Sequence, residues 1–146
     1  MSAVTQAPTP PRLEVVAELL TADVPSCGPH ERVGAVRAAL LGRRFESARE
    51  VAVLEGERLV GLLRIEDLLA APAERTAADL MDPDPPRIAP GTDREVAAWR
   101  AVQHREGSLA VVDAEGGFLG LVPPYRLLGW LLEAHEEDMA RLGGFM

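Results

Sequence analysis

The sequence is poor in several residue types, and each scarcity excludes a class of protein. Its single cysteine, Cys27, has no partner within the chain, so a disulfide-stabilised scaffold is excluded. Aromatic residues make up only 4% of the chain, so the core has to be built from Leu, Val and Ala. The 15 basic residues are outnumbered by 23 acidic ones, and the net charge of −8 disfavours binding to nucleic acid.

Long apolar segments and catalytic motifs are also missing. No run approaches the roughly 20 apolar residues that cross a bilayer, and residues 1–12 lack the apolar centre of a signal peptide. We therefore expect a cytoplasmic chain. The three histidines, His30, His104 and His135, lie far apart, and the sequence has no nucleophile and base combination or phosphate-binding loop. These absences predict that the chain is not an enzyme.

What the sequence does have is an internal repeat of about 60 residues. Residues 1–12 are small, polar and rich in proline, which predicts a disordered segment. Repeat 1 then spans residues 13–72 and repeat 2 spans residues 73–132. In the alignment of the two, Gly61-Leu62-Leu63 corresponds to Gly120-Leu121-Val122, and Leu68-Leu69 corresponds to Leu127-Leu128.

Both repeats predict the same elements: a short helix, a loop, a second helix, a β-hairpin and a final helix. The short helices are expected at residues 13–20 and 76–81, and the loops at DVPSCGP and DPDPPRIAPG. Two apolar runs flank Gly56 in the first hairpin, and a capping box of Thr92 and Glu95 marks a helix start in repeat 2. The fold class is α+β. Because about 60 residues are marginal for one core, we expect the two sheets to pack face to face.

This order of elements, with a hairpin of the form V-x-D/E-x-G-x-h-h-G-h-h where h is apolar, resembles the CBS domain. Two such repeats in tandem resemble a CBS pair, or Bateman module, and the resemblance covers residues 13–132. It implies two pseudo-symmetric repeats with small sheets packed on helices. It also implies a homodimer formed through the CBS repeats.

The last residues resemble one transporter family more closely. The segment from Glu133 to Gly144, EAHEEDMARLGG, is similar to the connecting, or plug, helix of MgtE-family magnesium transporters. That resemblance implies an acidic connecting helix over residues 133–146 and a transmembrane transport domain C-terminal to it. The function that follows is regulation of a magnesium or other divalent-cation transporter from its cytoplasmic side.

A helical wheel over residues 124–142 places Glu133, Glu136 and Glu137 on one polar face, with Asp138 beside the apolar stripe. Like charges at this spacing repel each other, and negative charge late in a helix opposes the helix dipole. Mg²⁺ prefers such carboxylate oxygens, so these four residues are the candidate metal ligands. The alternative is a polar face that is simply solvated. The transporter family often has Asp where this chain has Arg126 and Gly129, so two of its ligands are missing.

The resemblance to CBS pairs also raises a nucleotide site. The family signature for adenosine nucleotides, G-h-h-S/T-x-x-D, is matched in repeat 1 by Gly61 to Asp67, with Arg64 in place of the hydroxyl residue. In repeat 2 both polar positions are lost, to Pro123 and Arg126. Arg64 and Asp67 are thus the candidate nucleotide-binding residues. Two alternative functions stay open: a stand-alone sensor of AMP or ATP, and a dimerisation module without a ligand.

Overall fold

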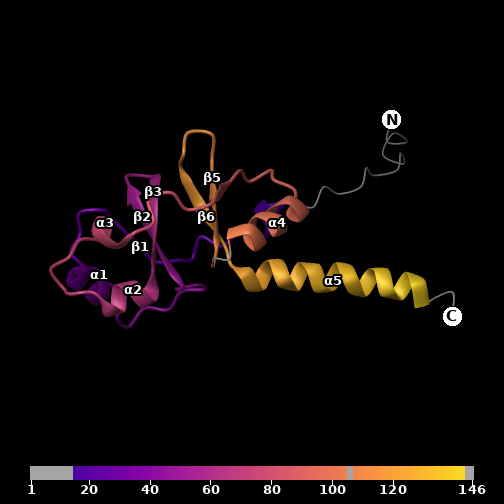
Figure 1. Cartoon of the computed structure of the whole chain (residues 1–146), viewed down its shortest axis with the longest axis horizontal. Coiled ribbons are helices and arrows are strands. Elements are labelled where there is room, and N and C mark those ends of the chain that lie inside the picture. Colours follow the sequence, from indigo (N-terminus) through magenta and orange to yellow (C-terminus); the bar gives the residue numbers. More distant parts are fainter. Residues whose placement is uncertain (1–14, 105–106, 144–146) are drawn as a thin grey trace, which may run out of the picture.

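Two small sheets, one from each repeat, form the centre of the molecule (Figure 1). The computed structural model describes residues 15–104 and 107–143. The strand orders are β1-β2-β3 and β4-β5-β6. The strands are β1 (Ser26–Cys27), β2 (Glu50–Glu55), β3 (Arg58–Arg64), β4 (Arg87–Ile88), β5 (Leu109–Val112) and β6 (Phe118–Val122). The helices are the 3-10 helix η2 (Val16–Leu19) and the α-helices α1 (Val33–Leu40), α2 (Ile65–Ala70), α3 (Ala77–Leu80), α4 (Arg94–His104) and α5 (Pro124–Gly143).

The predicted α+β class and the internal repeat are confirmed. Both hairpins form where the sequence predicts them, and their turns contain Gly56 and Gly116 with positive φ angles of 61° and 85°. The two hairpins also share a register shift, which lies directly after Val53 in one and directly after Val111 in the other. The repeats are therefore equivalent residue by residue up to this irregularity.

Two short strands lie in segments that the sequence predicts to be loops. Ser26–Cys27 pairs in parallel with β2, and Arg87–Ile88 pairs in parallel with β5. The proline before each strand takes part, because Pro25 O and Pro86 O accept hydrogen bonds from Ala52 N and Ala110 N. A strand of two residues is too short to show the alternation from which strands are recognised in a sequence.

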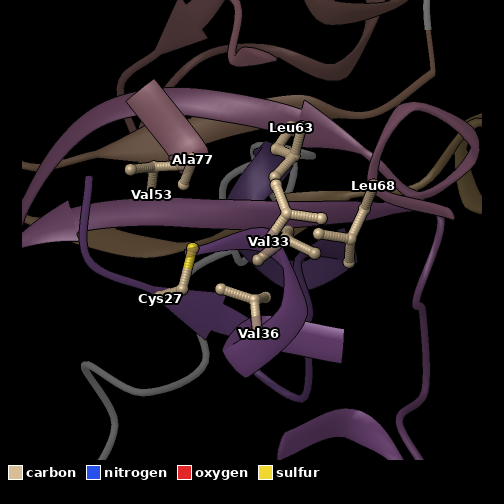
Figure 2. Packing of buried hydrophobic residues seen from close by; sticks show 8 residues of the cluster. Cys27, Val33, Val36, Val53, Leu63, Leu68 and Ala77 are labelled. Atoms are coloured by element: carbon tan, nitrogen blue, oxygen red, sulfur yellow. The ribbon is translucent and has the colours of Figure 1, made fainter. Parts of the chain in front are cut away.

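The repeats exchange their first helices. The core of repeat 1 includes Ala77 of α3, and the core of repeat 2 includes Val16 of η2 (Figure 2 shows the first of these). Backbone bridges from Thr76 to Arg32 and from Val15 to Asp93 fix these positions. The sequence assigns residues 13–20 to repeat 1 and residues 76–81 to repeat 2, whereas in space each segment completes the core of the other repeat.

The first core also holds the lone cysteine, Cys27, which packs against Val33, Val36 and Val53 (Figure 2). Its burial, with a smaller contribution from the charge of Glu31, raises the pKa of the thiol to about 11. The side chain is therefore a neutral thiol that packs as a small apolar group.

A third cluster joins the two sheets and confirms their face-to-face packing. Its buried residues alternate with those of the two cores along the strands and are Val24, Ala52, Leu59, Leu62, Ala110 and Leu121. The hairpins also contact each other through their backbones, because Leu59 N donates to Gly116 O and Phe118 N donates to Glu57 O. The repeats thus share one apolar junction.

Helix starts agree only in part with the sequence. A capping box does form at α3, where Thr76 N donates to Asp79 Oδ2 at 3.1 Å. The predicted capping box of Thr92 and Glu95 is wrong. Helix α4 begins at Arg94, and Asp93 directly before it accepts a hydrogen bond from Glu95 N at 2.8 Å. Asp and Thr are both good residues at this position, and the chain uses the one nearer the helix.

Helix α5 runs without a break from Pro124 to Gly143, and residues 144–146 of the predicted connecting helix lie outside the described residues. Its 20 residues make it about 30 Å long. Its first part lies beside α4, and its second part extends past the rest of the molecule (Figure 1). None of the described helices combines the length and the low polarity that crossing a membrane requires. The predicted disordered segment, residues 1–12, lies outside the described residues.

Candidate functional site

The junction between the repeats contains a buried carboxylate. Glu50, the first residue of β2, is 7% exposed, and Ser108, directly before β5, is 2% exposed. The Glu50 carboxylate accepts hydrogen bonds from Ser108 Oγ at 2.8 Å and from Ser108 N at 3.1 Å. A carboxylate removed from water requires such donors, so this pair fixes the position of one repeat against the other.

A cleft opens beside this pair. Its volume is about 60 Å³, and it is lined by Glu50, Leu62, Arg64, Asp82, Pro85, Pro86 and Ser108. Arg64 comes from the end of β3. Asp82 comes from the segment after α3, whose backbone pairs with Leu62 through hydrogen bonds of 2.8 and 3.1 Å. Arginine, carboxylate and hydroxyl groups together suit a ligand that has both phosphate and hydroxyl groups.

The structure separates the two residues that the sequence assigns to a nucleotide. Both side chains are exposed, but Arg64 lines the cleft and Asp67, on α2, is absent from the lining. The size of the cleft also matters, because pockets for small molecules usually have about 300–1,000 Å³. With its present volume of about 60 Å³, the cleft has room for a small polar group and has to widen before it admits a whole nucleotide.

The equivalent place in repeat 2 has a different arrangement. Thr21 is the counterpart of Asp82, because Thr21 pairs with Leu121 as Asp82 pairs with Leu62. The hydroxyl of Thr21 donates to Glu46 at 2.7 Å, and Glu46 forms an ion pair with Arg126. The counterpart of the cleft residue Asp82 therefore takes part in a network in which Glu46 and Arg126 neutralise each other.

Sequence reasoning missed Glu50, Ser108, Glu46 and Thr21. A signal for the first pair exists in hindsight. Glu50 is a charged residue at the start of the apolar run EVAVL, and the alignment of the repeats places Ser108 opposite it. No comparable signal marks Glu46, because it lies in a polar loop and meets Arg126 only after folding.

Of the four predicted metal ligands, Glu133 and Glu136 lie exposed, at the middle and in the second half of α5. The side chains of Glu137 and Asp138 lie outside the described residues, although the backbone there is helical. Where side chains are described, no group of three or more His, Cys, Asp or Glu residues is arranged to hold a metal ion. The helix therefore brings two carboxylates of the predicted set together on its exposed surface.

The α4–α5 surface, defined here as Trp99, Val102, Leu128, Leu131 and Leu132, is apolar and open to solvent. Trp99 is 67% exposed, Val102 is 69% exposed and Leu128 is 57% exposed. A hollow between the two helices, lined by Glu95, Ala98, Trp99, Val102 and Leu131, has a volume of about 260 Å³. Contiguous apolar side chains on a surface usually mark a site of association.

Comparisons with known proteins agree with this architecture. A family model described as the CBS domain matches residues 16–74 and 77–133. The magnesium transporter MgtE of Thermus thermophilus is 33% identical over 89 residues, which are 61% of this chain and 20% of the transporter. The chain thus corresponds to only a small part of that relative.

Solved structures with the same fold include transporter domains and stand-alone proteins. The soluble part of a magnesium transporter has a TM-score of 0.78 at 20% identity, covering 83% of this chain and 48% of that one. The cytosolic domain of the Mg²⁺ channel MgtE in complex with ATP has a TM-score of 0.75 at 25% identity, covering 80% and 48%. CBSX2 in complex with AMP has a TM-score of 0.69 at 22% identity, covering 83% and 98%.

Proposed function

Because this chain belongs to the CBS domain family and forms a CBS pair, a regulatory module, we propose that it regulates a magnesium or other divalent-cation transporter similar to MgtE. In this proposal the module lies on the cytoplasmic side of a membrane and a transport domain follows α5. It senses Mg²⁺ and gates ion transport. The observation that carries the proposal is α5 itself, which continues the last helix of repeat 2 into an acidic segment.

Charge repulsion in α5 provides the physical basis for sensing. The exposed carboxylates of Glu133 and Glu136 are three residues apart and therefore neighbours on the helix. Glu133 lies at the middle of α5 and Glu136 in its second half, closer to the negative end of the helix dipole. A divalent cation that Glu133, Glu136, Glu137 and Asp138 attract neutralises this charge and favours one position of the helix over another.

We also propose that the module is a homodimer. The α4–α5 surface exposes large apolar side chains that a second copy would remove from water. Aromatic residues such as Trp99 favour the centres of interfaces. In this arrangement the acidic segments of two chains begin next to a shared interface, so that neutralising them changes how the chains are held together.

Titration with Mg²⁺ tests the sensing proposal. We expect millimolar MgCl₂ to raise the Tm of the chain above the value found in NaCl of the same ionic strength. Neutralising the acidic segment with Glu133→Gln, Glu136→Gln, Glu137→Gln and Asp138→Asn should raise the Tm without Mg²⁺ and remove the response to it. A matched control, Glu55→Gln with Glu57→Gln, changes exposed carboxylates on the first hairpin and should keep the response. A wild-type chain that responds equally to both salts contradicts the proposal.

The cleft at Arg64 favours a second candidate function, the sensing of adenosine nucleotides. Its support is the guanidinium beside Ser108 and Asp82, together with the ATP and AMP complexes among similar structures. Calorimetry with AMP and ATP distinguishes the candidates. Submicromolar nucleotide binding that Arg64→Ala abolishes, combined with no response to Mg²⁺, favours the nucleotide sensor. If neither ligand binds, the remaining function is dimerisation alone.

A further inference from the structure

The two repeats differ sharply at one pair of equivalent positions, Asp67 and Arg126. Each residue directly precedes a buried leucine that packs into a core, Leu68 in α2 and Leu127 in α5. Asp67 is exposed. Arg126, in contrast, is partly buried and points its guanidinium back into the molecule, where its partners are.

The contacts of Arg126 connect three distant parts of the chain. Its Nη1 donates to Leu19 O at 3.1 Å and to Leu20 O at 3.0 Å. Its Nη2 forms the ion pair with Glu46, which belongs to the loop between α1 and β2 of repeat 1. The first turn of α5 is thereby tied both to the exchanged N-terminal segment and to the other repeat.

Further hydrogen bonds hold Glu46 in place. Thr21, which is buried, donates its hydroxyl hydrogen to the Glu46 carboxylate at 2.7 Å. Asp23 accepts a hydrogen bond from Glu46 N through its carboxylate at 3.1 Å. Charge-assisted hydrogen bonds of this kind are among the strongest in proteins, particularly when partly removed from water. The guanidinium is thus built into a network.

We propose that Arg126 is an internal clamp that fixes the first turn of α5 against repeat 1. Its guanidinium neutralises Glu46 and satisfies the carbonyls of Leu19 and Leu20, so that it holds the start of α5 against repeat 1 without any added molecule. The two repeats then differ at the counterparts Asp82 and Thr21, because Asp82 lines a cleft and Thr21 bonds to Glu46 of the clamp. Repeat 1 keeps an open cleft, and repeat 2 is fixed by its own side chains. This inference does not depend on which ligand the module senses.

Amide hydrogen exchange of the full chain, measured without Mg²⁺ or nucleotide, tests the proposal. The reporters are the amides of Thr21 and Leu121, which bond to each other's carbonyls at 2.8 and 2.9 Å. The internal control is the equivalent pair, Leu62 and Asp82, in repeat 1. In Arg126→Ala we expect exchange of the reporters to accelerate about tenfold while the control pair is unchanged.

Additional variants separate this clamp from a general loss of stability. Arg100→Ala removes another helix arginine, whose guanidinium donates to Arg87 O, and should leave the reporters unchanged. Glu46→Ala should reproduce the effect of Arg126→Ala, and the double variant should be no worse than either. If Arg126→Ala does not fold, Arg126→Lys keeps the charge without the planar fork and should show a smaller acceleration. Unchanged reporters, or equal acceleration of both amide pairs, overturns the proposal.

Discussion

Glu50 and Ser108 occupy equivalent positions in the two repeats and hydrogen-bond to each other. The pseudo-twofold axis that relates the repeats therefore passes between these two residues. A symmetric junction would have the same residue on both sides. Two glutamates would repel each other here, and two serines would have shorter side chains with which to contact each other. The chain instead places one acceptor opposite one set of donors, which makes the repeats complementary at this point.

Removing this carboxylate should destabilise the whole protein. In Glu50→Ala the buried Ser108 N and Oγ lose their acceptor, so we expect the free energy of unfolding to fall by about 2–3 kcal/mol. Glu55→Ala, at the exposed end of the same strand, should change it by less than about 0.5 kcal/mol. Urea unfolding measures both values. Equal stability of the two variants would show that the buried pair contributes little.

Two glycines in repeat 2 should respond to alanine in opposite directions. A Cβ at Gly120 would lie 2.6 Å from the backbone oxygen of Thr21, so Gly120→Ala should destabilise by roughly 1–3 kcal/mol. A Cβ at Gly129 meets nothing within 4 Å, and alanine favours the helix there. Gly129→Ala should therefore stabilise by about 0.5–1 kcal/mol. Thermal unfolding of both variants tests the pair, and a loss of stability in Gly129→Ala would contradict it.

The proposed dimer predicts a change of mass on mutation of the α4–α5 surface. Leu131→Glu places a charge among exposed apolar residues of two helices, so a dimer formed there should dissociate to monomers. Leu119→Glu, at an exposed apolar position on β6, serves as the control and should leave the dimer intact. Light scattering after size exclusion gives the masses. A Leu131→Glu variant that remains dimeric places the interface elsewhere.

The capping box at α3 predicts a dependence of stability on pH. Hydrogen bonds from the backbone and side chain of Thr76, then the neighbouring Arg75, lower the pKa of Asp79 below 3.8. Because the folded state lowers this pKa, the carboxylate stabilises the fold above pH 3.8, and this contribution disappears as the pH falls through the lower, folded-state pKa. Asp79→Asn should thus be less stable than the wild type at pH 7, and the difference should vanish in acid. A difference that does not change with pH would contradict this role.

The sequence predicts this fold well because the same pattern of elements occurs in both repeats. The hairpins around Gly56 and Gly116, the long helix α5 and the face-to-face packing of the two sheets all follow from patterns in the sequence. Contacts between residues distant in sequence were not predictable in the same way. Neither the exchange of η2 and α3 nor the ion pair of Glu46 with Arg126 leaves a periodic signal.

The candidate site was predictable only in part, and for the same reason. Of the two residues predicted to bind a nucleotide, Arg64 lines the cleft and Asp67 does not. The orientation of a side chain on a helix of six residues depends on how that helix packs, which the motif does not specify. The cleft is completed by Asp82 and Ser108, which reach it from the other repeat.

The exchanged helices also bear on how such a chain could be divided. If the polypeptide were cut between residues 72 and 76, each fragment would carry the helix that completes the core of the other fragment. Val16 would lie on the first fragment and Ala77 on the second. We expect neither fragment to fold alone and the two fragments, when mixed, to complement each other. By the same argument, a single repeat on its own would need a second molecule to supply this helix.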